Sequence, residues 1–316
     1  MLLEKRLALF KASLAEKNVV LPLHSFRSEY NRLIFKRRAL EFIISTLLFY
    51  GGQQFLIANA FFAPMWLTTG AALAAIFLRG NFLLLGIFAG TLIAYLANHL
   101  SWDISLLLSL IFVIYIYLMR KLAFLTIGPI VPLYNNAVLW KFYALIAVLS
   151  AVYSYVFFTL MVLKSLSGLL FFWVFMGWLA QINGILCVTL ICLVFDPYVM
   201  YRHFHKVRLW SILAVVIVIC HLFYFFVPAG IPSLVLSILF FAIFCVYAKY
   251  FGKVATCTML LGVSVIYLGG ITAPFHLFHA NSSELQVMVT LALFTLSAML
   301  SISIATAIRT PTFNNP

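Results

Sequence analysis

The stretch ISLLLSLIFVIYIYLM, residues 104–119, decides the fold class, because it is an unbroken apolar run without a charged side chain. A helix crosses a bilayer with about 20 such residues. Comparable runs lie near residues 40–60, 63–79, 82–100, 104–119, 142–163, 168–194, 209–227, 231–249, 255–274 and 285–307. They predict an all-α, polytopic transmembrane helical bundle of about ten helices, with roughly eight as the lower bound. The second run is short and abuts the first, which predicts a tight hairpin.

The composition indicates that the solvent of this protein is lipid. Of the 316 residues, 66% are hydrophobic and 9% are charged, whereas a soluble domain is about half apolar and a quarter charged. Such a chain has too little polar surface to coat a fold in water, so we expect the lipid bilayer to be its first partner. The five cysteines lie inside apolar runs and are expected to be small buried hydrophobic residues.

The basic residues predict the orientation. The formal net charge of +13 does not indicate nucleic acid, because the basic residues stand between apolar runs and not on one polar face. With the N-terminus inside, all of the 20 Lys and Arg residues except Lys164 fall on the inner side. This predicts a multi-pass membrane protein with both termini in the cytoplasm.

Three regions follow from this topology. Residues 1–38 form a basic cytoplasmic segment, 39–308 the integral membrane bundle, and 309–316 a short cytoplasmic tail. Within the first region, residues 2–14 are either an amphipathic helix on an anionic membrane surface or part of a solvated tail. Prolines and asparagines interrupt residues 120–141, which we interpret as a cytoplasmic interfacial loop or a broken helix.

Amides inside apolar runs are the main candidates for ligand binding. The first run carries Gln53, Gln54 and Asn59, and the sixth carries Gln181 and Asn183. Amides facing lipid are unfavourable, so these should face the bundle, where they either bind a ligand or link helices by hydrogen bonds. Trp66 and Trp178 are expected to be interface anchors, and a place of Trp66 in a ligand-binding site is the less favoured alternative.

Small residues predict where helices approach each other closely. Gly70 and Ala74, and also Gly86 and Gly90, are four residues apart and so share one helix face. Gly184 stands beside the amides of the sixth run. We expect all five to be helix-packing positions.

Catalytic side chains are scarce. The seven Asp and Glu residues lie mostly in the N-terminal segment or at the predicted membrane edges. Glu41, just inside the first run, is expected to pair with Arg37 or Arg38. No nucleotide-binding motif is present, so we expect no enzyme activity, no catalytic residues and no cofactor. His276 and His279 are three apart and are weak candidates for a metal site, which we otherwise do not expect.

Two segments resemble a known family. Met65 to Ala75, followed by Arg79-Gly80 and by Gly86 to Gly90, is similar to the membrane-associated sensor (MASE) domain of the first type. Trp178 to Thr189 resembles a second patch of that family. Leu67 stands where the family usually has Pro, and Gln181 where it usually has Asp. The resemblance covers roughly residues 40–305 and implies a bacterial multi-helix sensor usually joined to a histidine kinase or a diguanylate cyclase.

The leading hypothesis is therefore a bacterial inner-membrane sensory or ligand-binding module that lacks an output domain. It would signal through a separate partner, such as a histidine kinase or a diguanylate cyclase, after a small molecule shifts its helix packing. The alternative is a secondary transporter, or a membrane subunit of an uptake system, for a small molecule. A membrane enzyme for lipid-linked substrates is the third reading, which the scarcity of acidic residues disfavours.

Overall fold

The fold was analysed in a computed structural model that describes residues 23–58, 66–128, 135–162, 170–194, 231–272 and 284–307. These residues form helices and short turns, without a strand, so the all-α prediction is confirmed for this part of the chain. The elements are α2 (Leu23–Ala58), α3 (Leu67–Arg79), α4 (Leu83–Ala97), α5 (Trp102–Ile127), α6 (Asn136–Val162), α7 (Leu170–Gly184), the π-helical segment η1 (Ile185–Thr189), α8 (Leu190–Val194), α11 (Ile231–Thr272) and α12 (Glu284–Ala307).

Three stretches of the described residues are long and apolar enough to cross a membrane: Trp102–Ile127, Asn136–Met161 and Phe171–Val194. Shorter apolar helices are Leu67–Arg79, Leu83–Ala97, Gly252–Val265 and Leu291–Ala307. Helices of this composition are compatible with a lipid bilayer. The third stretch is the most enclosed, since 72% of its most apolar window is buried.

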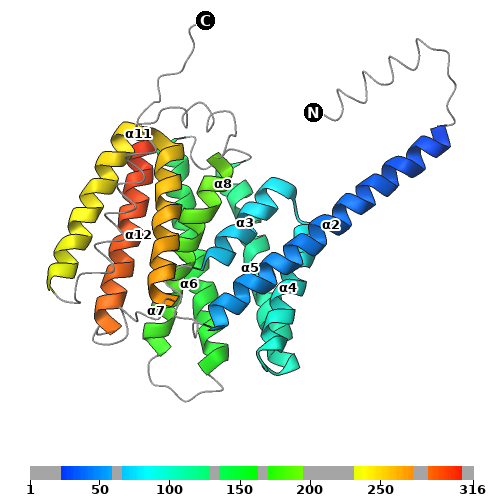
Figure 1. The fold of residues 1–316 in the computed structure, drawn as a ribbon, viewed down its shortest axis with the longest axis horizontal. Helices are drawn as coiled ribbons and strands as arrows, with labels where there is room; N and C mark the ends of the chain where they lie inside the picture. The colour runs from blue at the N-terminus through cyan, green and yellow to red at the C-terminus, as the bar shows by residue number, and fades with distance from the viewer. Residues whose placement is uncertain are drawn as a thin grey trace, which may run out of the picture. The chain divides into compact units, whose positions relative to one another are not determined.

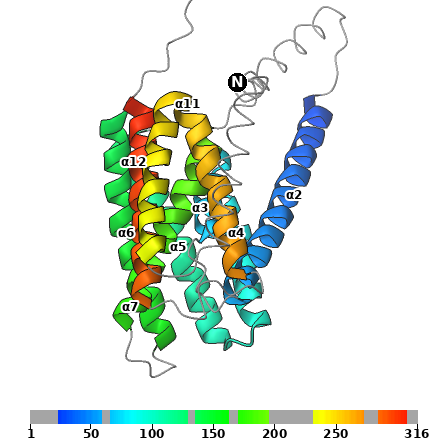
Figure 2. The same ribbon diagram turned by 60° about the vertical axis from the view of Figure 1, so that its left-hand side comes forward.

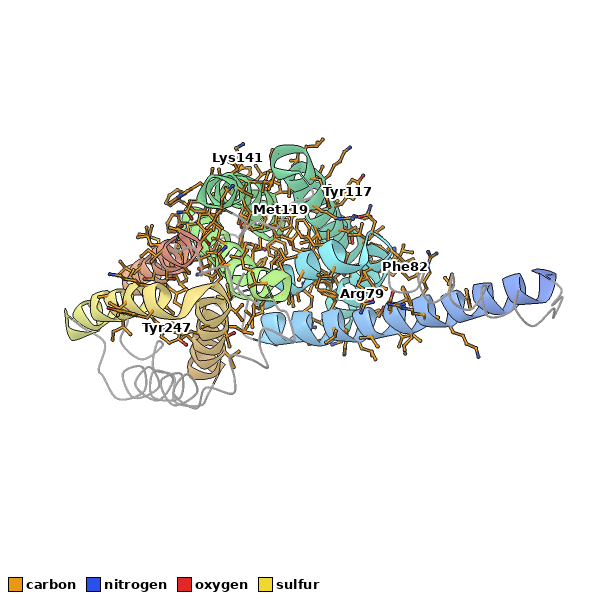
Figure 3. All side chains as sticks on the ribbon, turned by 90° about the horizontal axis from the view of Figure 1, so that it is seen from above. Arg79, Phe82, Tyr117, Met119, Lys141 and Tyr247 are labelled. Carbon is orange, nitrogen blue, oxygen red and sulfur yellow. The ribbon has the colours of Figure 1, made fainter. Side chains whose placement is uncertain are left out.

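Helix α5 shows how these helices divide their surface. Leu108, Phe112 and Met119 are buried, and they point into the bundle. On the opposite face, Leu107 and Ile114 are exposed, as are Leu110, Leu118 and Leu125. Figure 3 shows Met119 inside the bundle and Tyr117 at its edge. An outward face made of large aliphatic residues is expected where a helix meets lipid.

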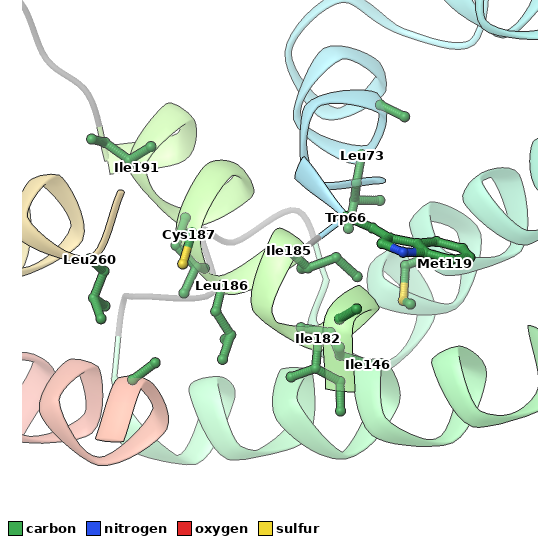
Figure 4. Packing of buried hydrophobic residues seen from close by; sticks show 14 of the residues in the cluster. Trp66, Leu73, Met119, Ile146, Ile182, Ile185, Leu186, Cys187, Ile191 and Leu260 are labelled. Atoms are coloured by element: carbon green, nitrogen blue, oxygen red, sulfur yellow. The ribbon is translucent and has the colours of Figure 1, made fainter. Parts of the chain in front are cut away.

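Four helices lie side by side, α6, α7, α11 and α12, each packed on at least one of the others (Figures 1 and 2). Helix α3 contacts α7 and η1 on one side and α5 on another. The close-up in Figure 4 shows the resulting core, where Trp66 and Leu73 of α3 lie near Met119 of α5 and Ile185 of η1. The start of α3 is thus enclosed by other helices.

Of the two interpretations of residues 120–141, the loop is wrong for residues 120–127, and the broken helix is not contradicted. Helix α5 continues to Ile127, eight residues beyond the predicted end, and residues 120–127 are not a loop. It ends at Gly128, whose φ of 81° suits glycine. Helix α6 begins at Asn136, because the Asn135 side chain caps it by accepting a hydrogen bond from the Val138 N–H at 2.8 Å. The prolines that suggested a longer break lie outside the described residues.

The predicted spans 231–249 and 255–274 fall in α11, which consists of two helices that meet at a kink at Gly252. Gly252 has φ 75° and ψ −173°, a backbone conformation that favours glycine. The predicted span 209–227 lies outside the described residues. The count of about ten helices and the cytoplasmic placement of the termini stay predictions.

The domain boundary at residue 38 stays a prediction. Helix α2 begins at Leu23 within the basic segment and continues past that boundary to Ala58. Glu41 accepts a hydrogen bond from Arg37 Nε at 3.1 Å, one turn away, as an exposed ion pair. The predicted amphipathic helix over residues 2–14 lies outside the described residues, as does the tail 309–316.

Candidate functional site

The start of α3 lies directly on the backbone of α7, at a crossing made by two glycines. The Trp66 N–H donates to the carbonyl of Ala180 at 3.0 Å. A Cβ on Gly184 would collide with the Trp66 carbonyl, and a Cβ on Gly70 with the Gly184 carbonyl. The two backbones can meet at this distance only because both positions lack a side chain.

The Trp66 side chain lies in a buried group of aromatic rings from α5 and α6. It is 3% exposed and meets Phe157 edge-on, with ring centroids 5.3 Å apart. Phe158 and Tyr153 also contact it, at 6.2 and 6.3 Å. The indole Nε1–H has no hydrogen-bond acceptor within the described part of the chain, although a buried indole N–H usually has one. Trp66 is therefore a core residue and not an interface anchor.

Gln181 is the most unusual residue of the described bundle. Its side chain is completely buried, yet neither Oε1 nor Nε2 has a hydrogen-bonding partner among the described residues. Gln181 is close to the midpoint of Phe171–Val194, the enclosed membrane-compatible stretch. An unpaired buried polar group costs about 1–3 kcal/mol, and an amide carries both a donor group and an acceptor.

The neighbours of Gln181 on α7 show which way it faces. Gly177, Gln181 and Gly184 are spaced by four and three residues, so they lie on one face of the helix. A Cβ on Gly177 would collide with the Phe158 ring, and a Cβ on Gly184 with the Trp66 backbone. Gln181 therefore lies on the face of α7 that packs against the Phe158 ring and the start of α3.

Two threonines lie in the first turn of α3. Thr69 is completely buried and Thr68 is half-buried, and the described structure provides no hydrogen-bonding partner for either hydroxyl. A Cβ on Gly52 of α2 would collide with the Thr68 methyl, so α2 closes this side. Sequence reasoning missed both threonines; the signal available was their place directly after Trp66, at the start of a helix. Thr68 is two residues from Gly70, which faces α7, so Thr68 lies on the opposite face of α3, toward α2, and outside this site. We call Trp66, Thr69 and Gln181 the amide site.

Asn183 is not part of the amide site, contrary to the reading of Gln181 and Asn183 as one polar cluster. Two residues along an α-helix rotate a side chain by about 200°. Asn183 accordingly faces α12, where its Oδ1 accepts a hydrogen bond from the Thr295 hydroxyl at 2.9 Å. Its Nδ2 has no partner among the described residues. Asn183 thus joins α7 to α12 and lies on the far side of the helix.

A π-helical segment follows the amide site directly. Residues Ile185–Thr189 form η1, the only π-helical element in the described ranges. Such segments are rare and frequent at functional sites. Here the Thr189 hydroxyl donates to the carbonyl of Gly70 at 2.8 Å, so η1 holds the first turns of α3 from a second point.

Among the ligand-binding candidates of the first predicted span, Gln54 takes part in helix packing. The Gln54 Oε1 accepts a hydrogen bond from Asn98 Nδ2 at 2.8 Å, and its Nε2 donates to the Ala94 carbonyl at 3.4 Å. Gln54 therefore links α2 to the end of α4. Gln53 is buried, at 4% exposure, and Asn59 lies outside the described residues.

The remaining packing candidates are buried. A Cβ on Gly90 of α4 would collide with the Thr46 carbonyl of α2, so this pair of helices is also in close contact. Ala74 and Gly86 are buried in α3 and α4. His276 and His279 lie outside the described residues, and the described part contains no cluster of three or more His, Cys, Asp or Glu residues suited to a metal ion.

The fold and the amide site define a class: an all-helical protein with apolar helices fit for a bilayer and an uncharged polar site enclosed among them. Comparison of the chain with protein-family models, with curated proteins and with solved structures finds no match.

Proposed function

We propose that this chain is a sensory, ligand-binding module of the bacterial inner membrane, a multi-pass protein that signals through a separate partner. The observation that carries the proposal is the Gln181 amide, which is completely buried, with both polar atoms unpartnered among the described residues, on the face of α7 that packs against the start of α3. A bound small molecule would supply the missing hydrogen bonds. The free-energy cost of the unpartnered amide would then contribute to the binding of that ligand.

Ligand binding at the amide site could change helix packing, because three elements are joined there. The Trp66 N–H bonds to α7, the Thr189 hydroxyl of η1 bonds to α3, and α3 also packs on α5. A ligand that binds one arrangement of α3 on α7 better than another shifts the population toward it. Helix α3 would carry that shift to Arg79 at the other end, which the predicted topology places at the cytoplasmic face.

The resemblance to membrane-associated sensor domains agrees with this proposal. The two similar segments, Met65 to Ala75 and Trp178 to Thr189, are those that cross at Gly70 and Gly184. Gln181 stands where that family usually has Asp. A neutral amide at this position would give a signal that does not depend on the ionisation of a carboxylate.

The first test is an affinity purification of the intact protein from native membranes, with mass spectrometry of the recovered proteins. We expect a histidine kinase or a diguanylate cyclase, recovered with the wild type and with Gln54→Leu alike. If no signalling protein is recovered under mild detergent or after crosslinking in the membrane, the sensory proposal is wrong.

One observation favours transport as the second candidate. Helix α3 has 13 residues, about 20 Å of helix against about 30 Å of hydrocarbon. Half-length helices whose N-termini face a site near the bilayer midplane are common in transporters. Uptake of a small molecule into proteoliposomes containing only this protein would favour this reading over a sensor.

A further inference from the structure

We propose that the outward face of α5 binds one anionic phospholipid, with the headgroup phosphate at Arg120 and Lys121 and the acyl chains along the same helix. The inference depends neither on the amide site nor on the sensory function. It rests on the position of the two cations, on the contacts that they make and on the apolar surface beside them.

The two cations stand inside an apolar helix and not at its end. Both belong to Trp102–Ile127, a stretch long and apolar enough to cross a membrane. Large exposed side chains precede and follow the pair on the helix: Tyr117, Leu118, Phe124 and Leu125. Long basic side chains in such surroundings extend to the level of the lipid headgroups, where their charged ends meet phosphate.

Neither cation has an anionic partner within the described structure. The Arg120 guanidinium donates to the Asn81 side-chain oxygen, in the turn before α4, and its centre lies 5.3 Å from the centroid of the Phe124 ring. These contacts hold the guanidinium in place without neutralising it. Lys121 is exposed and forms no ion pair with a described residue. The one acidic residue of α3, α4 and α5 is Asp103, about 25 Å from Arg120 along the helix.

An apolar stripe runs along α5 from the cations toward the start of the helix. It consists of exposed residues spaced three or four apart, which therefore share one face: Leu107, Leu110, Ile114 and Tyr117. Lys121 continues the series. The helix rises about 20 Å from Leu107 to Lys121, which exceeds half of the hydrocarbon thickness of a bilayer, about 15 Å. The stripe is thus long enough to lie along the acyl chains of one leaflet.

Charge and shape together favour an anionic phospholipid over other occupants. A guanidinium beside an ammonium binds phosphate oxygens through charge-assisted hydrogen bonds. A soluble anion would use the two cations and leave the stripe unused, and the cationic headgroup of a zwitterionic lipid would be repelled by them. The predicted topology places both cations at the cytoplasmic leaflet, where anionic lipids carry the negative surface charge.

The test compares two phospholipids that share their acyl chains, dioleoylphosphatidylglycerol and dioleoylphosphatidylcholine. Each is titrated into the purified full-length protein in detergent, and native mass spectrometry counts the bound lipids. We expect phosphatidylglycerol to bind about tenfold more tightly or better, since each cation near a phosphate contributes about fivefold. A large excess of inorganic phosphate should not displace it, because phosphate lacks the acyl chains.

Substitutions locate the binding site. Lys121→Gln should weaken phosphatidylglycerol binding about fivefold and leave the melting temperature unchanged, because the side chain is exposed. Arg120→Gln should weaken binding as much, whereas Arg120→Lys, which keeps the charge, should retain most of the affinity. Lys141→Gln is the matched control: Lys141 is an exposed lysine and the one charged residue of α6, apart from Tyr117 in Figure 3. It should bind like the wild type.

Several outcomes would overturn the inference. They are equal affinity for the two lipids, displacement by phosphate alone, and a loss in Lys141→Gln as large as in Lys121→Gln. The same spectra show whether a second copy of the chain or another protein is bound. If such a complex forms and is lost in Lys121→Gln, a protein and not a phospholipid covers this face of α5.

Discussion

Two glutamines within the helical bundle have opposite surroundings, although both belong to apolar stretches. Gln54 uses both ends of its amide, accepting from Asn98 and donating to the Ala94 carbonyl, and so fixes α2 on α4. Gln181 is more deeply buried and uses neither end within the described structure. The first residue stabilises the protein; the second is an unfavourable residue unless something else binds it. The difference separates a structural amide from a functional one, a distinction that burial alone does not make.

The largest expected effect is a loss of stability when the glycine crossing, where α3 meets α7 at Gly70 and Gly184, is disturbed. Gly184→Ala places a methyl group against the Trp66 backbone, which cannot move without displacing α3, and we expect a loss of about 3 kcal/mol of stability. Gly51→Ala is the matched control, because nothing lies within 4 Å of its Cβ position; it should be neutral or stabilising by up to about 1 kcal/mol. Melting of both variants in detergent measures this. Equal melting temperatures would show that α3 and α7 are not in close contact.

The second prediction concerns Gln181 without any ligand. Gln181→Leu removes two unpartnered buried polar atoms at nearly constant volume, so the ligand-free protein should become more stable, by about 1–2 kcal/mol. Thermal or denaturant unfolding of the purified, ligand-free variant provides the measurement. A clear loss of stability would mean that Gln181 is hydrogen-bonded in the native protein and would remove the basis of the amide site.

The third prediction is that replacing Gln54 changes stability in the opposite direction, by lowering it. Gln54→Leu removes the acceptor of the Asn98 amide and the bond to Ala94, and interhelical hydrogen bonds in membranes contribute about 0.6 kcal/mol each. We expect a loss of about 1 kcal/mol, seen as a lower melting temperature. If Gln54→Leu and Gln181→Leu shift the melting temperature in the same direction, the distinction between the two glutamines fails.

The sequence predicts the helical class and most helix positions, because long apolar runs are a strong signal. It also selects Trp66 and Gln181, since amides and tryptophans stand out there. It does not separate Gln181 from Asn183, whose side chains leave opposite faces of α7, nor Gln181 from Gln54, because hydrogen-bond partners are set by tertiary contacts. The partners of Gln54 come from α4, about 40 residues later in the chain. The sequence does not predict the full extent of α5, because Arg120 and Lys121 end the apolar run, although the helix continues through them to Ile127.

The smallest expected effect is the loss of stability on removing the hydrogen bond by which η1 holds α3. Thr189→Val keeps the shape of the side chain and removes the donor to the Gly70 carbonyl, which should lower stability by about 0.6 kcal/mol. Thr91→Val in α4 is the matched control: its hydroxyl donates within its own helix, to the Ile87 carbonyl at 2.9 Å, where the backbone bond of that carbonyl remains. We expect Thr91→Val to be close to neutral. Hydrogen exchange sharpens the comparison, because Thr189→Val should increase exchange in the first turn of α3 and leave α4 unchanged. Equal exchange in both variants would show that the bond between Thr189 and Gly70 does not restrain α3, and that the glycine crossing holds it alone.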